Sequence, residues 1–80
     1  MIVNRTENFQ KIFDNLDNSL RQKVMKQIQK IVINPEIGKP MKYDRRGTRE
    51  LYTKPFRISY YYHKEELLIL FLDLYHKDEQ

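Results

Sequence analysis

The sequence predicts an α+β fold in which a hairpin of two helices packs on one face of an antiparallel sheet. In the first half of the chain, apolar residues recur at the spacing of a helix face, with one polar break near residue 17. In the second half, apolar residues first alternate with polar ones and then run almost without interruption, as in strands. The expected order of elements is β-α-α-β-β-β, and the second face of the sheet should be open.

The N-terminal half is expected to hold one short strand and two helices. Met1–Arg5 can form the strand, and the apolar residues that follow lie at i, i+3, i+4 and i+7: Phe9, Ile12, Phe13 and Leu16. Ser19 is the expected N-cap of the second helix, whose apolar stripe comprises Leu20, Val24, Ile28, Ile31 and Val32. That helix should end at Asn34, because a residue before a proline disfavours helical geometry.

The C-terminal half predicts three strands after a loop at Pro35–Arg46. Thr48–Lys54 follows a glycine and should be the first of them. Phe56–His63 alternates, which places Tyr61 on the face opposite the core. Leu67–Tyr75 is apolar at nearly every position, as expected of a central strand that is covered on both faces.

The composition indicates a single small domain, expected to span residues 1–80. The chain has no cysteine, which excludes disulfides and thiolate metal sites and fits a cytoplasmic protein. The longest apolar run, Leu67–Leu72, is too short to cross a bilayer, so no membrane association is expected. The two histidines lie on separate elements and no glycine-rich phosphate loop is present, so neither a metal nor a nucleotide cofactor is expected.

Positive charge is concentrated in one segment of the chain. Lys39–Arg57 carries seven basic and two acidic residues, a local balance of +5, whereas the whole chain carries +4. The rest of the protein therefore has a net charge of −1. A compact basic segment next to several tyrosines suits a phosphate backbone, and the sequence thus indicates RNA as a partner.

These features together resemble the RelE/ParE superfamily of bacterial and archaeal toxins, and the resemblance covers nearly the whole chain. The matching features are Asn34-Pro35 after the second helix, Gly-Lys-Pro at 38–40, the Phe56–Tyr60 strand segment FRISY, and Tyr-His-Lys at 75–77. The resemblance implies a toxin of a type II toxin–antitoxin module. It also implies a hetero-oligomer with a cognate antitoxin protein.

Within this superfamily, RelE-like members cleave mRNA in the ribosomal A site, whereas ParE-like members inhibit DNA gyrase. The RelE-like branch is favoured, because the YoeB and YafQ relatives also place a histidine near the C-terminus, where His76 lies. The resemblance therefore implies an mRNA interferase, with mRNA and the ribosome as partners. A gyrase inhibitor and a catalytically inactive, antitoxin-binding relative remain as alternatives.

Cleavage of RNA by internal attack requires a base for the 2′-OH, stabilisation of the phosphorane charge, and an acid for the 5′-oxygen. The resemblance implies that Arg57 contacts the scissile phosphate and that His76 is the general acid. Glu50, or alternatively Lys54, would be the base. The same side chains have simpler interpretations, since Arg57 can form a cross-strand ion pair with Asp73 or Glu50 and His76 can be a solvated terminal side chain.

A second set of residues is expected to hold RNA or ribosomal phosphates. It contains four cations of the basic segment and one lysine near the C-terminus: Lys42, Arg45, Arg46, Arg49 and Lys77. Tyr61 or Tyr75 is expected to stack on a base.

Overall fold

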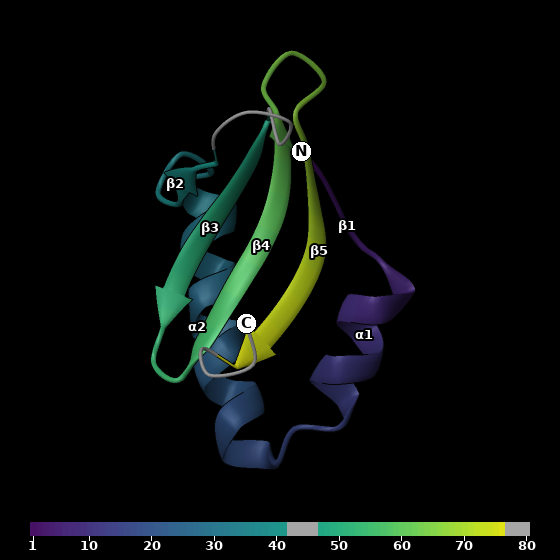
Figure 1. Ribbon diagram of the computed structural model, residues 1–80. Helices are drawn as coiled ribbons and strands as arrows, with labels where there is room; N and C mark the ends of the chain where they lie inside the picture. Colours follow the sequence, from purple (N-terminus) through teal and green to yellow (C-terminus); the bar gives the residue numbers. More distant parts are fainter. Residues whose placement is uncertain (42–46, 77–80) are drawn as a thin grey trace.

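The structure of the protein, a computed structural model, describes residues 1–41 and 47–76. Among these residues, two helices and five strands follow one another in the order β1 (Ile2–Arg5), α1 (Glu7–Asp14), α2 (Asn18–Ile33), β2 (Lys39–Pro40), β3 (Thr48–Thr53), β4 (Phe56–His63) and β5 (Leu68–His76). The predicted α+β class and the helical hairpin are confirmed (Figure 1). Neither helix in this part of the chain is long and apolar enough to cross a membrane.

The strands form one mixed sheet in the order β1-β5-β4-β3-β2. β2, β3, β4 and β5 pair in antiparallel fashion, whereas β1 runs parallel to β5. The sheet is therefore not wholly antiparallel as the sequence predicted. The difference arises because β1 is followed by the two helices rather than by a tight turn to its neighbour. Only strands joined by a tight turn must be antiparallel.

Both helices begin with a side-chain cap. Thr6 accepts a hydrogen bond from the Phe9 N–H at 3.1 Å, and Asp17 accepts one from the Leu20 N–H at 2.9 Å. The predicted cap at Ser19 is wrong, because the second helix begins one residue earlier, at Asn18, and Ser19 lies in its first turn. Aspartate, asparagine and serine are all favoured at a helix N-cap, so residue type alone does not choose among Asp17, Asn18 and Ser19.

The hydrophobic core lies between the helices and one face of the sheet, with α2 behind the sheet in Figure 1 and α1 beside β5. Its buried residues come from α1, α2, β4 and β5: Phe9, Val24, Ile31, Phe56, Ile58, Tyr60, Ile69, Phe71 and Leu74. The other side of β3, β4 and β5 faces the viewer in Figure 1, where the helices lie behind or beside the sheet. We call this side, which the helices do not cover, the open face.

The connection between α2 and β2 is fastened to the sheet by Tyr60 and Arg49. The Tyr60 hydroxyl donates to the Pro35 carbonyl at 2.7 Å and accepts from the Gly38 N–H at 2.9 Å. The Arg49 guanidinium donates to the carbonyls of Glu36 and Gly38 at 3.0 and 2.7 Å. Residue 38 must be glycine, because an added Cβ would lie 2.6 Å from the Tyr60 hydroxyl oxygen. These contacts fix the position of β2 at the edge of the sheet.

Candidate functional site

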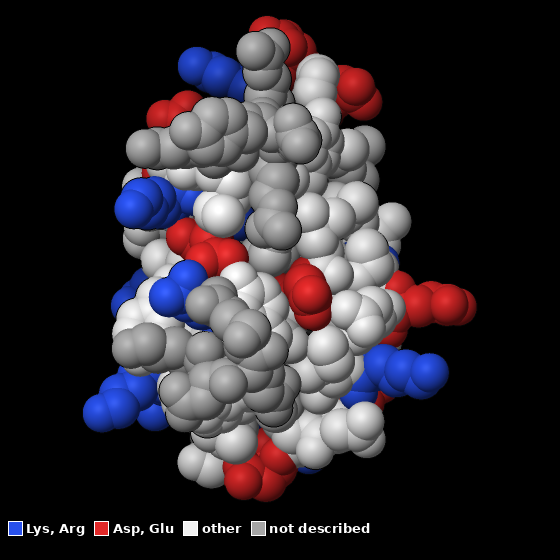
Figure 2. Space-filling view, viewed as in Figure 1, with Lys and Arg blue, Asp and Glu red and all other residues white. Residues whose placement is uncertain are grey.

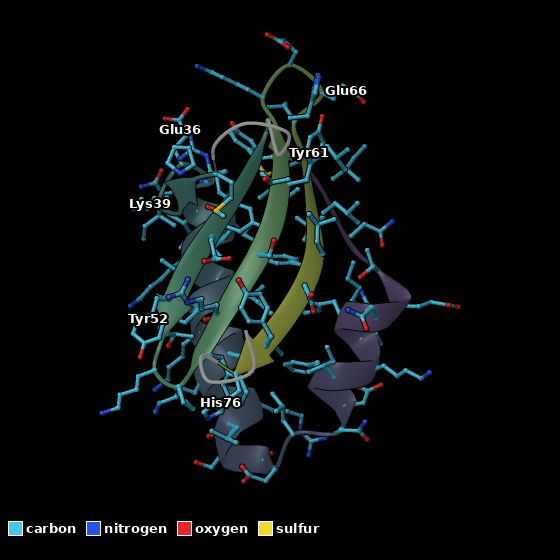
Figure 3. All side chains as sticks on the ribbon, viewed as in Figure 1. Glu36, Lys39, Tyr52, Tyr61, Glu66 and His76 are labelled. Carbon is cyan, nitrogen blue, oxygen red and sulfur yellow. The ribbon has the colours of Figure 1, made fainter. Side chains whose placement is uncertain are left out.

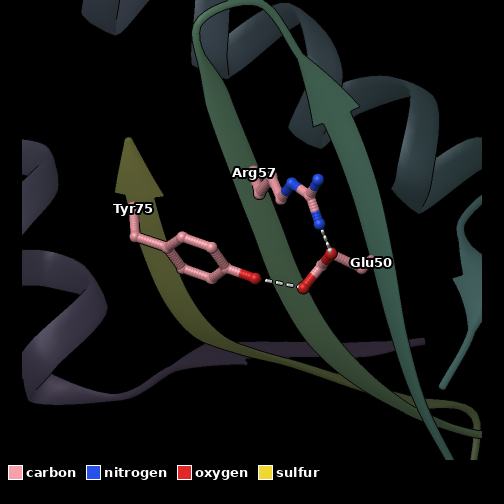
Figure 4. Close-up of polar contacts among 3 residues, drawn as sticks. All are labelled: Glu50, Arg57 and Tyr75. Atoms are coloured by element: carbon pink, nitrogen blue, oxygen red, sulfur yellow. Dashed lines mark hydrogen bonds and ion pairs between the residues drawn. The ribbon is translucent and has the colours of Figure 1, made fainter. Parts of the chain in front are cut away.

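Three side chains from three neighbouring strands meet on the open face. The Arg57 guanidinium on β4 lies 2.9 Å from Oε1 of Glu50 on β3, and the Tyr75 hydroxyl on β5 donates to Oε2 of the same carboxylate (Figure 4). We call these residues the Glu50–Arg57–Tyr75 cluster. One carboxylate therefore has a cation on one oxygen and a phenol on the other.

The register of the sheet explains why these residues meet. Arg57 lies directly opposite Tyr52 on β3 and Tyr75 on β5, while Glu50 lies opposite Ser59. Residues two apart on a strand share a face, so Glu50 is the diagonal neighbour of Arg57. The arrangement follows from strand pairing, and none of the three residues belongs to a loop.

The cluster is partly screened from solvent. The Glu50 side chain is 11% exposed and the Arg57 side chain is 31% exposed. The Nε atom of Arg57 is buried and has no hydrogen-bond partner among the described residues. A carboxylate held in this way interacts with its partners more strongly than a fully hydrated one, because the surrounding dielectric is lower. The guanidinium keeps donor capacity for a second anion.

His76 points to the other side of the sheet from Arg57. It lies opposite Phe56 in the β4–β5 register, and the two rings meet edge to face with centroids 5.7 Å apart. Phe56 is buried in the core, so His76 is on the helix-covered side at the lower end of β5 (Figure 3). The structure does not bring His76 together with Arg57 and Glu50.

A β-bulge accounts for the placement of His76. Ser59 pairs with Asp73 whereas its neighbour Tyr60 pairs with Phe71, so Leu72 is an extra residue on β5. Strict alternation from Leu68 would have placed His76 on the open face. Beyond the bulge, each side chain of β5 lies on the opposite face from the one that strict alternation predicts. Tyr75 rather than His76 therefore lies beside Arg57.

The remaining predicted site residues are dispersed. Lys54 is exposed in the turn between β3 and β4. Arg49 points to the helix-covered side, where its guanidinium holds the α2–β2 connection. Tyr61 lies near the far end of β4 from His76 (Figure 3), and its ring covers Gly47, whose φ of +82° favours glycine. The expected phosphate-binding residues Lys42, Arg45, Arg46 and Lys77 lie outside the described residues.

Two residues of the open face were not among the predicted site residues. Lys39 on β2 is opposite Glu50, and Tyr52 on β3 is opposite Arg57 with the guanidinium carbon 6.0 Å from its ring centroid. The two-residue turn at Lys54-Pro55 was the available signal, since it fixes the β3–β4 register and hence the pairing of Tyr52 with Arg57.

Charge is unevenly distributed over the open face. Figure 2 shows carboxylates near the middle of this face and cationic side chains mainly along the side on which β2 and β3 lie. Glu50 and Arg57 belong to the middle of the face, and Lys39 and Lys54 are exposed on the β2–β3 side. An approaching polyanion would therefore meet cations at this edge before it reaches the cluster.

The sequence matches one protein-family model. Residues 6–80 match the family described as the ParE toxin of the type II toxin–antitoxin system parDE. The match covers nearly the whole chain, including every strand and helix after β1. No curated protein matches the sequence.

Several solved structures share the fold at low sequence identity. The RelBE2 toxin–antitoxin complex from Mycobacterium tuberculosis contains a chain with a TM-score of 0.83 and 19% identity, over 95% of this chain and 96% of that one. The isolated E. coli RelE toxin has a TM-score of 0.83 and 13% identity, over 99% and 86%. The YoeB/ParE toxin from Agrobacterium tumefaciens has a TM-score of 0.81 and 17% identity, over 95% and 98%. At these identities the likeness concerns the fold.

Proposed function

We propose that this protein, which belongs to the ParE toxin family of type II toxin–antitoxin systems, is an endoribonuclease that cleaves mRNA on the ribosome. The observation that carries the proposal is the Glu50–Arg57–Tyr75 cluster. It combines a poorly hydrated carboxylate, a guanidinium with spare donors and a phenol within one set of hydrogen bonds. These are the group types that internal attack by a ribose 2′-OH requires.

Glu50 is assigned as the general base. It would accept the 2′-OH proton as the 2′-oxygen attacks the phosphorus atom. Its side chain is 11% exposed and its Oε1 lies 2.9 Å from the Arg57 guanidinium, so the carboxylate is held beside the position that we assign to the phosphate.

Arg57 is assigned to the phosphate. Its planar guanidinium can give up the contact with Glu50 and form two hydrogen bonds to the non-bridging oxygens of the phosphorane. The Arg57 side chain is 31% exposed, so part of the guanidinium is accessible to an incoming phosphate. The negative charge that develops in the transition state would thus be stabilised by a group already in position.

Tyr75 is assigned as the proton donor to the 5′-oxygen that leaves. The P–O5′ bond breaks as the O2′–P bond forms, and the phenol proton passes to the 5′-oxygen. Because Tyr75 hydrogen-bonds to Glu50, the proton that Glu50 took from the 2′-OH can return to the phenolate. The net reaction moves one proton from the 2′-oxygen to the 5′-oxygen, and it leaves a 2′,3′-cyclic phosphate and a 5′-hydroxyl.

The ribosome enters this proposal as the agent that positions the mRNA. The cluster lies on a sheet surface, and its three polar groups would contact one phosphodiester rather than a base edge. Correct placement of the 2′-OH in line with the leaving oxygen must then come from elsewhere, and a ribosome-bound codon supplies it. The basic segment Lys39–Arg57 would contact ribosomal or messenger phosphates.

A cognate antitoxin is the second partner that we propose. A groove of about 320 Å³ lies between β1 and the two helices, and its apolar lining includes Val3, Phe9, Phe13, Met25, Ile28 and Phe71. Met25 and Val3 are 41% and 44% exposed, so this surface offers apolar area to a partner. Met25→Glu should weaken antitoxin binding, and an unchanged affinity would place the antitoxin elsewhere.

Inhibition of DNA gyrase is the alternative, and the family description as a ParE toxin favours it. The two activities are separated by one pair of assays on the purified protein. Cleavage of mRNA in the presence of ribosomes, lost when the riboses carry no 2′-OH, would support the nuclease. Inhibition of gyrase supercoiling without any cleavage would replace it.

A further inference from the structure

The start of α1 is hydrogen-bonded to β5, the strand beside it (Figure 1). Thr6, the N-cap of α1, donates its N–H to the Phe71 carbonyl at 2.9 Å and its hydroxyl to the Leu72 carbonyl at 2.8 Å. Asn8, in the first turn, donates its side-chain amide to Oδ1 of Asp73 at 3.0 Å. Two residues at the start of α1 therefore hold three consecutive residues of β5.

These three residues of β5 contain its β-bulge. Leu72 is the extra residue, between the positions that pair with Ser59 and Tyr60. A bulge interrupts the ladder, so its backbone groups need other partners. The Thr6 hydroxyl is the partner of the Leu72 carbonyl, just past the point where β1 stops pairing with β5. The start of α1 thus takes the place of a pairing strand beside the bulge.

The bulge determines which side chain of β5 reaches Arg57. It lies three residues before Tyr75, which is directly opposite Arg57 on the open face. Leu74, between the bulge and Tyr75, is fully buried and favours the same assignment of faces. Burial of an apolar side chain is non-directional, however, whereas a hydrogen bond fixes the distance and angle between two groups. The position of the Tyr75 hydroxyl therefore depends on the bonds that hold the bulge.

We infer that Thr6 and Asn8 are positioning residues for Tyr75. They hold the bulge in place and so keep the phenol within the cluster. Asp73 extends the link, since its Oδ1 accepts the Leu74 N–H at 2.8 Å as well as the Asn8 amide. The inference rests on the proposed function, in which Tyr75 donates the proton to the 5′-oxygen.

The Thr6 hydroxyl has two partners at once. It accepts from the Phe9 N–H at 3.1 Å, which caps α1, and it donates to the Leu72 carbonyl. Thr6→Val keeps the shape of the side chain and removes both bonds, whereas Thr6→Ser keeps both. Asn8→Ala, at an exposed position, removes only the side-chain amide and tests the same link should Thr6→Val fail to fold. Asp17→Ala is the matched control, because it removes the N-cap of α2 and leaves the contacts of β5 in place.

The placement of Tyr75 can be measured by NMR without any RNA. Directly opposite residues have Cβ atoms about 4.5–5.5 Å apart, so the side chains of Arg57 and Tyr75 should show nuclear Overhauser effects. Those between Arg57 and Tyr52, on the other neighbouring strand, are the internal reference. We expect Thr6→Val and Asn8→Ala to weaken the first set of signals and to keep the second. Thr6→Ser and the control variant should keep both.

Cleavage on the ribosome supplies the second readout. Thr6→Val should lower the single-turnover rate by about 10- to 10²-fold, the loss expected when a catalytic group is displaced by about 1 Å. It should leave the half-saturating ribosome concentration unchanged, and Thr6→Ser should retain the wild-type rate. In the Tyr75→Phe background, Thr6→Val should have no further effect, because the effects of residues that act through one group are not additive.

The inference is overturned if Thr6→Val and Asn8→Ala keep the Tyr75 signals and the wild-type rate, or if Asp17→Ala loses as much as Thr6→Val. An equal effect of Thr6→Val in the wild type and in Tyr75→Phe would also overturn it, because Thr6 would then act on the fold as a whole. If the wild type cleaves no RNA, the proposed function fails, while the NMR comparison still decides whether Thr6 and Asn8 place Tyr75.

Discussion

Glu50 and Arg57 form a 2.9 Å ion pair across β3 and β4 although the two residues are not opposite each other in the register. Arg57 faces Tyr52 and Glu50 faces Ser59, so the contact is diagonal. Under the proposed function, this ion pair would hold the base and the phosphate-binding group in one place before RNA binds. It also means that a phosphate must compete with Glu50 for the guanidinium.

Glu50→Gln should therefore separate binding from cleavage. Loss of the carboxylate frees Arg57 for phosphate, so affinity for an uncleavable RNA should be equal to or greater than that of the wild type. Loss of the base should lower the cleavage rate by about 10²- to 10⁴-fold. Both quantities can be measured on one preparation, by filter binding and by single-turnover cleavage.

Glu66→Gln is the matched control for that change. Glu66 is an exposed carboxylate in the β4–β5 turn, at the far end of the sheet from Tyr52 and His76 (Figure 3). It should leave both cleavage and binding unchanged. Equal losses in the two variants would attribute the effect to net charge and contradict the role of Glu50.

Arg57→Ala should lower the cleavage rate by about 10²- to 10³-fold, since the developing phosphorane charge loses its closest donor. It should also reduce the salt dependence of RNA binding, with the slope of log K against log salt falling by about 0.7 for one lost phosphate contact. Lys30→Ala, on α2 behind the sheet, should change neither quantity. A slope that drops equally in both variants would mean that Arg57 makes no specific phosphate contact.

Tyr75→Phe and His76→Ala distinguish the proton donor. Tyr75 belongs to the cluster, whereas His76 packs against Phe56 on the other side of the sheet. We expect Tyr75→Phe to lose most of the cleavage activity and His76→Ala to lose less than about tenfold. The rates are measured by single-turnover cleavage across pH. A larger loss in His76→Ala than in Tyr75→Phe would identify His76 as the general acid.

Tyr60→Phe should lower the free energy of unfolding by about 1–3 kcal/mol, because the buried Gly38 N–H loses its acceptor. Tyr62→Phe, on the same strand, should cost less than about 0.5 kcal/mol. Urea unfolding measures both. A Tyr60→Phe variant as stable as the wild type would show that the α2–β2 connection is held by other contacts.

The same tyrosine should make stability depend on pH in the alkaline range. Burial raises the pKa of Tyr60 above its ordinary value, although the Gly38 hydrogen bond and the Arg49 charge act in the opposite direction. As the pH rises past about 10, the unfolded chain loses the phenol proton while the folded protein keeps it, so stability falls. This decline should be smaller in Tyr60→Phe, and an identical decline would mean that other groups cause it.

Local patterns predicted much of the fold. Alternation placed β4 at Phe56–His63 with the observed bounds, and it assigned Tyr60 to the core. Alternation could not predict the parallel pairing of β1 with β5, because the helices, β2, β3 and β4 all lie between these two strands in the sequence. Nonlocal pairing of this kind is set by packing rather than by any residue of the strand itself.

The candidate site was predictable in part. The sequence identifies Arg57 and Glu50 as site residues, and it is compatible with the cross-strand ion pair that they form. The bulge at Leu72 carries no glycine or proline to mark it, so alternation along β5 could not show that Tyr75 rather than His76 would face Arg57. The position of Tyr52 opposite Arg57 depends on the β3–β4 register, which the two-residue turn at Lys54-Pro55 fixes.

The most direct test of the Glu50–Arg57–Tyr75 cluster as a nuclease is induced expression in a host cell, with growth and primer-extension mapping of mRNA ends. Wild type, Arg57→Ala and Glu50→Gln are compared with Glu66→Gln. We predict growth arrest and new mRNA ends within translated codons for the wild type and Glu66→Gln, and neither for the two cluster variants. Growth arrest by the wild type without new mRNA ends, or cleavage that persists in Arg57→Ala and Glu50→Gln, would contradict the account.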